Sequence, residues 1–213
     1  EFRGDAGDDH ACLIDDVGAL WCWGSNTQGQ SGPTDAVEDC GVDLCAVQID
    51  LPWLPTSIEA VELGGEFSCV LDDAGSTYCW GRNEYGTLGT GSNKGSGVPV
   101  PISGGLSFQS FPTTQNWGSC GITIEGDAYC WGWWGWNHGE EFHTQGSDIR
   151  TTPTLVPGGL NISSMGVGED HGCAVTTSDA AFCWGTNDRR QLGDGSRTNR
   201  TEPTPVSGNQ SFV

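Results

Sequence analysis

The residues with the greatest chemical capacity lie in one short segment. Between Cys130 and His143 the chain carries four tryptophans, two histidines and two glutamates. Flat aromatic faces stack on sugar rings or anchor protein interfaces, whereas imidazoles and carboxylates are ligands for divalent metals. The segment therefore predicts a binding surface, with metal binding as a second kind of chemistry.

The tryptophans of this segment outnumber what one structural position needs. Trp131 follows a cysteine as a tryptophan does elsewhere in the chain, so the tryptophans after it are surplus. The alternative is that they pack against a neighbouring repeat or another subunit. The candidate binding residues are Trp133, Trp134, Trp136, Asn137 and His138.

Metal binding is the alternative use of the same segment. Two imidazoles and two carboxylates can hold a divalent cation, although a solvated polar loop is the commoner outcome. The candidate ligands are His138, Glu140, Glu141 and His143. Acidic pairs such as Asp15-Asp16 and Asp72-Asp73 are typical of Ca²⁺ ligands, but at these positions they favour turn formation. We expect no cofactor, with Ca²⁺ as the alternative.

Cysteine chemistry defines the elements that must position these residues. Four times a cysteine is followed, after nine residues, by Cys-Trp-Gly; the pairs are Cys12/Cys22, Cys69/Cys79, Cys120/Cys130 and Cys173/Cys183. Gly18, Gly75, Gly126 and Asp179 each stand six residues after the first cysteine, where a hairpin turn needs positive φ. Folding each segment around that turn brings its two cysteines opposite each other, within disulfide range. The spacing predicts one cross-strand disulfide in every repeat.

The repeat predicts an all-β architecture. The first cysteines recur every 51 to 57 residues, a period typical of blade repeats. Alternating side chains make both faces of each hairpin apolar, as in stacked propeller blades. We expect a single domain over 1–213, a β-propeller or open propeller-like array of four-stranded antiparallel blades. Its four repeats are approximately 1–57, 58–108, 109–161 and 162–213, and the N-terminal segment is a candidate for completing the last one.

Several motif elements recur in register and carry a family resemblance. Gly7-Asp8-Asp9-His10 is matched by Gly168-Glu169-Asp170-His171, and Trp23-Gly24-Ser25-Asn26 by Trp80-Gly81-Arg82-Asn83. The pattern resembles the regulator of chromosome condensation repeat family of β-propellers, in a version with paired cysteines that is similar to secreted members. The resemblance implies four-stranded blades around an axis, with loops on two rims. This chain departs from it by having four repeats where the family usually has seven.

The recurring histidines suggest a structural role. His10 and His171 occupy one repeat position, two residues before a cysteine. We expect them to form hydrogen bonds between adjacent strands or blades.

Composition restricts the partners and the compartment. The net charge is −20 with only 8 Lys and Arg, which argues against nucleic acid because phosphate binding needs clustered basic residues. No apolar run is long enough to insert into a membrane. Ten cysteines, including a fifth pair Cys40/Cys45, favour a secreted, extracellular or cell-surface protein. Glycosylation sequons begin at Asn161, Asn199 and Asn209.

These observations predict a non-catalytic extracellular protein for recognition or assembly. Rim loops and the tryptophan-rich third repeat would bind another protein or a second copy of the chain. The alternative is a glycan-binding module using Trp133, Trp134 and Trp136. A second alternative is a hydrolase with a metal or an acidic pair on the rim.

Overall fold

The protein is built from four similar antiparallel sheets. The computed structural model describes residues 3–33, 46–49, 57–111, 117–133, 149–168 and 171–208. Within these residues sixteen strands form four sheets of four strands, and each sheet takes its strands from one repeat in chain order. The expected all-β architecture of four-stranded antiparallel blades is therefore confirmed.

The blades divide the chain into four consecutive stretches. The first contains β1 (Gly4–Ala6), β2 (His10–Ile14), β3 (Leu20–Gly24) and β4 (Val47–Ile49). The second contains β5 (Ile58–Leu63), β6 (Phe67–Asp72), β7 (Thr77–Gly81) and β8 (Ser96–Pro101). The third contains β9 (Phe108–Ser110), β10 (Gly118–Thr123), β11 (Ala128–Trp133) and β12 (Ile149–Leu155). The fourth contains β13 (Ile162–Val167), β14 (His171–Thr176), β15 (Ala181–Gly185) and β16 (Arg200–Pro205). The N-terminal strand β1 pairs with β2 of its own repeat.

The central hairpin of each blade has the predicted register. The two cysteines of every pair face each other across the second and third strands. All four pairs form disulfides, with a Cα–Cα distance of 4.1 Å in each. The fifth pair, Cys40 and Cys45, lies outside the described residues.

The hairpin turns also follow the expected chemistry. The turn residue has positive φ in every repeat, at 86° in Gly18, 83° in Gly75, 87° in Gly126 and 62° in Asp179. Asp15 Oδ1 accepts hydrogen bonds from the backbone N–H groups of Val17 and Ala19, at 3.0 and 2.8 Å. Asp72 makes the same pair of bonds in the second blade. The acidic residues in these turns therefore satisfy backbone donors, as the turn interpretation requires.

Alternation gives every blade two apolar faces. The cysteine face consists of four positions on the second and third strands: Cys12, Ile14, Leu20, Cys22; Cys69, Leu71, Thr77, Cys79; Cys120, Ile122, Ala128, Cys130; and Cys173, Val175, Ala181, Cys183. The tryptophan face consists of the intervening positions: Ala11, Leu13, Trp21, Trp23; Ser68, Val70, Tyr78, Trp80; Ser119, Gly121, Tyr129, Trp131; and Gly172, Ala174, Phe182, Trp184.

The core lies between successive blades. In the first core cluster Cys12 and Cys22 of the first cysteine face pack with Val70 and Trp80 of the second tryptophan face. The two following clusters repeat this arrangement between the second and third blades and between the third and fourth. Each internal joint thus packs the cysteine face of one blade against the tryptophan face of the next.

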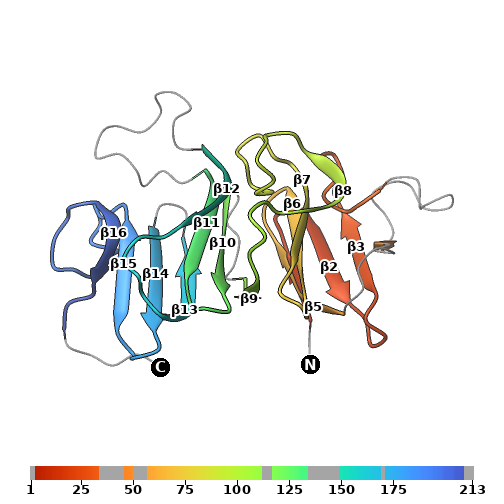
Figure 1. Cartoon of the computed structure of the whole chain (residues 1–213). Helices are drawn as coiled ribbons and strands as arrows, with labels where there is room; N and C mark the ends of the chain where they lie inside the picture. The colour runs from red at the N-terminus through yellow and green to blue at the C-terminus, as the bar shows by residue number, and fades with distance from the viewer. Residues whose placement is uncertain are drawn as a thin grey trace.

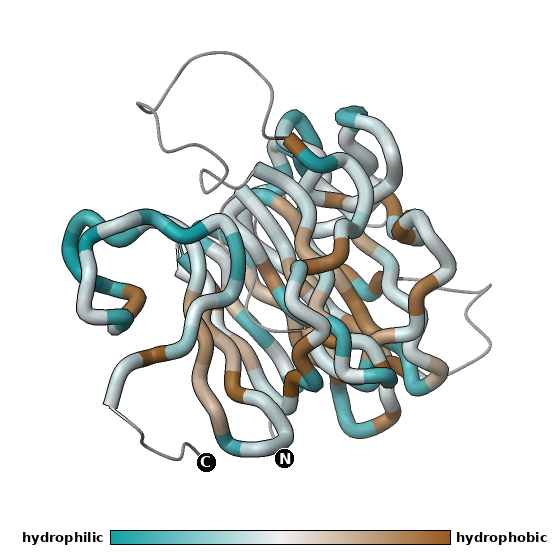
Figure 2. Tube along the Cα trace, turned by 60° about the vertical axis from the view of Figure 1, so that its left-hand side comes forward, coloured by the Kyte–Doolittle hydropathy of each residue, from teal (hydrophilic) through white to brown (hydrophobic). Residues whose placement is uncertain are grey.

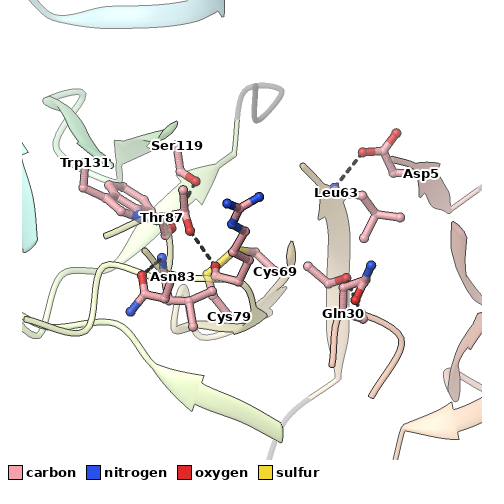
Figure 3. The surroundings of a disulfide bond; sticks show 12 residues. Asp5, Gln30, Leu63, Cys69, Cys79, Asn83, Thr87, Ser119 and Trp131 are labelled. Carbon is pink, nitrogen blue, oxygen red and sulfur yellow. Dashed lines mark hydrogen bonds between the residues drawn. A yellow bond between two sulfur atoms is a disulfide. The ribbon is translucent and has the colours of Figure 1, made fainter. Parts of the chain in front are cut away.

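A backbone carbonyl at each of the first two joints binds the next blade. The carbonyl of Gln30 accepts hydrogen bonds from Trp80 Nε1 and Ser68 Oγ, both at 2.8 Å. The carbonyl of Thr87 accepts from Trp131 Nε1 at 2.9 Å and from Ser119 Oγ at 3.4 Å (Figure 3). A buried indole N–H needs such an acceptor, because an unsatisfied polar group in the core is costly.

His10 confirms the structural role expected from its position. Its Nε2 atom lies 2.9 Å from Ser68 Oγ, across the joint between the first two blades. Burial lowers the pKa of His10 more than the nearby carboxylates of Asp5, Asp8 and Asp9 raise it. The imidazole is therefore neutral at pH 7 and bridges the two blades.

The four blades stand in chain order as an array, with the first and fourth blades at opposite sides (Figure 1). Hydrophobic residues concentrate along the strands of the stacked sheets, whereas the turns and loops are mostly hydrophilic (Figure 2). Within the residues described, no helix has the length and apolar character that a membrane crossing requires.

Candidate aromatic site on the rim

In each of the first three blades, an equivalent backbone hydrogen bond joins two residues at the rim. The backbone N–H of Ser25 donates to the carbonyl of Asp9 at 2.8 Å, and that of Arg82 donates to Glu66 at 2.9 Å. In the third blade the same bond joins Trp133 to Trp117, at 2.7 Å. The third blade therefore places two indoles where the first two blades place polar or charged side chains.

These two tryptophans form a cluster with a tyrosine from the second blade. The ring of Tyr85 meets that of Trp117 edge to face, with centroids 4.7 Å apart. Its centroid lies 6.5 Å from that of Trp133, with the rings tilted by 54°. Because Tyr85 follows β7, whereas Trp117 precedes β10 and Trp133 ends β11, the cluster spans the joint between the second and third blades.

A guanidinium group covers the cluster. Arg82 Cζ lies 5.7 Å from the centroid of Tyr85 and 5.4 Å from that of Trp117, within cation–π range. Its nitrogens also form salt bridges, one to Glu66 and one to Glu84 at 2.6 Å. Hydrogen bonds to Glu84 and then to Glu66 raise the pKa of Arg82 above its ordinary value. We call Glu66, Arg82, Glu84, Tyr85, Trp117 and Trp133 the aromatic rim.

The aromatic rim is open to solvent. Trp117 is 37% exposed and is one of five large hydrophobic residues that remain exposed in the described part of the chain. The side chain of Glu84 is 64% exposed, and that of Glu66 is 35% exposed. The surface therefore offers aromatic rings beside accessible carboxylate oxygens.

The predicted binding residues fall only partly within the structure. Trp133 ends β11 and belongs to the aromatic rim, and its role in binding stays a prediction. Trp134, Trp136, Asn137 and His138 lie outside the described residues, as do the candidate metal ligands Glu140, Glu141 and His143. Among the residues that are described, no group of three or more metal-ligating side chains comes together.

Two of the three glycosylation candidates are described, and both are exposed. Asn161 precedes β13, and its carbonyl accepts a backbone hydrogen bond from Thr177. The side-chain oxygen of Asn199 accepts from the backbone N–H of Asn187 at 2.8 Å. Asn209 lies outside the described residues. Glycosylation at these positions stays a prediction.

Sequence reasoning missed Glu66, Arg82, Glu84, Tyr85 and Trp117. The sequence does contain a signal for Trp117. The residue three positions before the first cysteine is acidic in the other three repeats, where it is Asp9, Glu66 or Asp170. A tryptophan at a position that is otherwise acidic indicates a change of surface function. No such comparison identifies Tyr85, which joins the cluster only because the two blades are adjacent.

Solved structures share the fold. Human WBSCR16 superposes with a TM-score of 0.78 at 18% identity, over 97% of this chain and 52% of that one. Prp20p from Saccharomyces cerevisiae gives 0.72 at 17% identity, over 97% of this chain and 50% of that one. The ectodomain of the Arabidopsis thaliana receptor kinase ACR4 gives 0.51 at 19% identity, over 87% and 50%. The chain thus matches about half the length of each of these structures.

Similar sequences occur within much longer proteins. The chain is 27% identical over 206 residues to the E3 ubiquitin-protein ligase HERC2 of Homo sapiens, covering 95% of this chain and 4% of that protein. It is 28% identical over 209 residues to the probable E3 ubiquitin-protein ligase HERC4 of Homo sapiens, covering 94% of this chain and 19% of that protein.

Two family models, both described as the regulator of chromosome condensation (RCC1) repeat, match the chain. One matches residues 5–30, 58–87 and 162–191, and the other matches residues 74–115 and 178–213. Together these segments cover more than half of the chain and coincide with the first, second and fourth blades and the start of the third. The chain belongs to the RCC1 repeat family.

Proposed function

We propose that the chain is an extracellular recognition protein whose aromatic rim binds a cationic segment of another protein. The observation that carries this proposal is the aromatic rim itself, where exposed Trp117 stands beside the carboxylates of Glu66 and Glu84. Binding of this kind requires no catalysis.

The rim already binds one cation in this way. Arg82 lies over Tyr85 and Trp117 while two carboxylates neutralise it. A lysine or arginine of a partner would find the same combination on the exposed side of Trp117 and Glu84. Aromatic residues dominate the energy of protein interfaces because they bury a large area with few rotatable bonds.

The charge of the whole chain favours a basic partner. A net charge of −20 attracts cationic segments over several ångströms and speeds their encounter. Prp20p, which shares the fold, is described as binding Gsp1p and histones, so a protein partner has a precedent on this architecture. The ligase activity of the HERC proteins is not carried over, because the chain spans only 4% and 19% of their lengths.

The disulfides support an extracellular location. Four bridges, one per blade, are typical of proteins in an oxidising compartment such as the secretory pathway, because disulfides are rare in reducing compartments. We therefore place the proposed partner outside the cell or at its surface.

A defined peptide tests the proposal. A lysine–glycine decapeptide and its fully acetylated counterpart would be titrated against the chain by calorimetry. We expect the cationic peptide alone to bind, Trp117→Ala to weaken binding by about tenfold or more, and Glu84→Gln to weaken it several-fold. Glu202→Gln on β16 is the matched control, since it removes the same charge from an exposed site on another blade.

Two results would refute the rim as the binding site. One is unchanged affinity of Trp117→Ala; the other is equal loss of affinity in Glu84→Gln and Glu202→Gln. Either result would mean that the peptide responds to the overall charge and not to the aromatic rim.

Glycan binding is the second candidate, and the exposed ring of Trp117 is the observation that favours it. An indole that is open on one face can stack on a sugar ring, and Glu84 would accept hydrogen bonds from its hydroxyl groups. A soluble glycan that quenches tryptophan fluorescence in the wild type but not in Trp117→Ala would favour this candidate over a protein partner.

A further inference from the structure

The guanidinium group of Arg82 lies in the aromatic rim as a bound ligand would. All its nitrogens donate to carboxylates: Nε and Nη2 to Glu84 Oε2, at 3.2 and 2.6 Å, and Nη1 to Glu66. Its central carbon lies 5.7 and 5.4 Å from the ring centroids of Tyr85 and Trp117. Two carboxylates and two aromatic rings thus surround one planar cation.

The fold does not need this side chain. Arg82 stands two residues after the tryptophan of its Cys-Trp-Gly motif, and Ser25, Trp133 and Thr186 take that position in the other blades. What Ser25, Arg82 and Trp133 share is the backbone N–H, which donates to the residue that precedes the second strand of the blade. The guanidinium group is therefore particular to the second blade and not part of the repeat.

Arg82 is also held by bonds that open easily. The side chains of its partners Glu66 and Glu84 are 35% and 64% exposed, and ion pairs between accessible groups contribute little because water and salt screen them. Arg200 of the fourth blade differs, since it pairs with Asp194, whose side chain is 3% exposed. Displacing Arg82 into solvent therefore costs less than displacing Arg200.

From these observations we propose that Arg82 is an internal occupant of the binding site and that an arginine of the partner takes its place. This inference rests on the proposed function and narrows the cationic segment to one that carries arginine. When Arg82 turns into solvent, the carboxylates of Glu66 and Glu84 and the rings of Tyr85 and Trp117 receive the guanidinium group of the partner.

Arginine fits this place better than lysine. A guanidinium group is flat, and its donors form a rigid fork that reaches two carboxylates while its face lies on aromatic rings. An ammonium group is a compact, strongly hydrated point charge without this planar arrangement of donors. The groups around Arg82 are therefore selective for a second arginine.

Internal occupancy lowers the affinity for such a partner. An arginine ligand binds only while Arg82 is displaced, so its apparent dissociation constant is the intrinsic one divided by the fraction of open sites. Removing the side chain of Arg82 opens every site. A lysine ligand that binds beside Arg82, on the exposed side of Trp117, gains only from the change in charge.

An arginine–glycine decapeptide, titrated by calorimetry beside the lysine–glycine decapeptide, tests the proposal. Arg82→Ser gives the second blade the residue that the first blade has at this position. We expect it to bind the arginine peptide about tenfold more tightly than the wild type does, and the lysine peptide less than about threefold more tightly. Arg197→Ser, which removes the same charge from an exposed loop of the fourth blade, is the matched control and should raise both affinities equally and only slightly.

A second measurement follows Arg82 in the wild type. In a chain with isotope-labelled arginine, the Nε proton of Arg82 should exchange faster with water once the unlabelled arginine peptide is bound. The Nε proton of Arg200, which donates to Asp194 at 2.8 Å, is the internal control and should not change.

Different outcomes would refute this inference and the proposed function. Peptide binding to the wild type with no gain in Arg82→Ser, or with the same gain in Arg197→Ser, would overturn the inference alone. A loss of affinity in Arg82→Ser would also overturn it, because Arg82 would then be part of the site. Binding of the arginine peptide to Arg82→Ser but of neither peptide to the wild type would support the inference and refute the proposed function. Binding of neither peptide to either chain would refute both.

Discussion

At the scale of single residues, a few polar groups join an otherwise apolar stack. The indole N–H groups of Trp80 and Trp131 each donate to a carbonyl of the preceding blade. A neutral His10 adds a bond to Ser68 at the first joint. The sequence predicted the histidine contact from its repeat position, but it did not predict the indole–carbonyl bonds, because their acceptors lie in loops of another repeat.

Removing one indole N–H should weaken one joint. Trp80→Phe leaves the Gln30 carbonyl with Ser68 as its remaining donor and leaves a small void. We expect it to lower the free energy of unfolding by about 1–3 kcal/mol, measured by guanidinium denaturation without reductant. Trp23→Phe, at the partly buried equivalent position of the first blade, is the control and should change the free energy of unfolding by less than about 0.5 kcal/mol. Equal losses in the two variants would contradict the inter-blade role of Trp80.

Glu62 gives the molecule a pH dependence that its sequence does not reveal. Burial, together with the charge of Asp5, raises the pKa of Glu62 from its ordinary 4.5 to about 7. Asp5 is held there because its carboxylate accepts from the backbone N–H of Leu63 at 2.8 Å (Figure 3). A raised carboxyl pKa means that the folded state binds the proton more tightly than the unfolded state. The free energy of unfolding therefore falls as pH rises from about 4.5 to about 7.

Glu62→Gln should remove this loss. At pH 8 we expect the variant to unfold with a free energy about 1–2 kcal/mol higher than the wild type, since each pKa unit corresponds to about 1.4 kcal/mol and partial exposure reduces the effect. At pH 4 the two should be equal. Glu59→Gln, on the exposed side of the same strand, is the control and should show no such pH-dependent gain. A gain of similar size at both pH values would show that titration of Glu62 is not its cause.

At the scale of elements, the hairpin is the unit that sequence reasoning described best. The cysteine register, the disulfides and the positive φ of the turn residue all follow from a spacing that recurs four times. Local geometry is predictable here because a turn of fixed length determines which residues face each other. The long loops carry no such constraint, and the cluster around Tyr85 depends on which loops of adjacent blades meet.

Gly18 allows a clean test of the hairpin turn. Its φ is 86°, and a Cβ built on it would have no atom within 4 Å, so a side chain there meets only backbone strain. We expect Gly18→Ala to lower the free energy of unfolding by about 1–2 kcal/mol, as measured by chemical denaturation. Asp179→Gly, at the same position of the fourth repeat, should raise the free energy of unfolding. An unchanged stability of Gly18→Ala would contradict the turn geometry.

At the scale of the whole molecule, the sequence predicted the class of architecture and the number of repeats. It also predicted that the sheets are apolar on both faces, which requires stacking. It did not show that the stack is directional, with every cysteine face turned to the following tryptophan face. That direction becomes visible only when the burial of equivalent residues is compared between blades.

The stacking of cysteine faces on tryptophan faces is tested most directly by the exchange rates of individual indole protons, measured by NMR on the non-reduced chain. We expect slow exchange for the indole protons of Trp80 and Trp131, which are buried in joints, and fast exchange for that of Trp23. A Trp23 proton as protected as that of Trp80, or fast exchange at Trp80 and Trp131, would contradict this stacking.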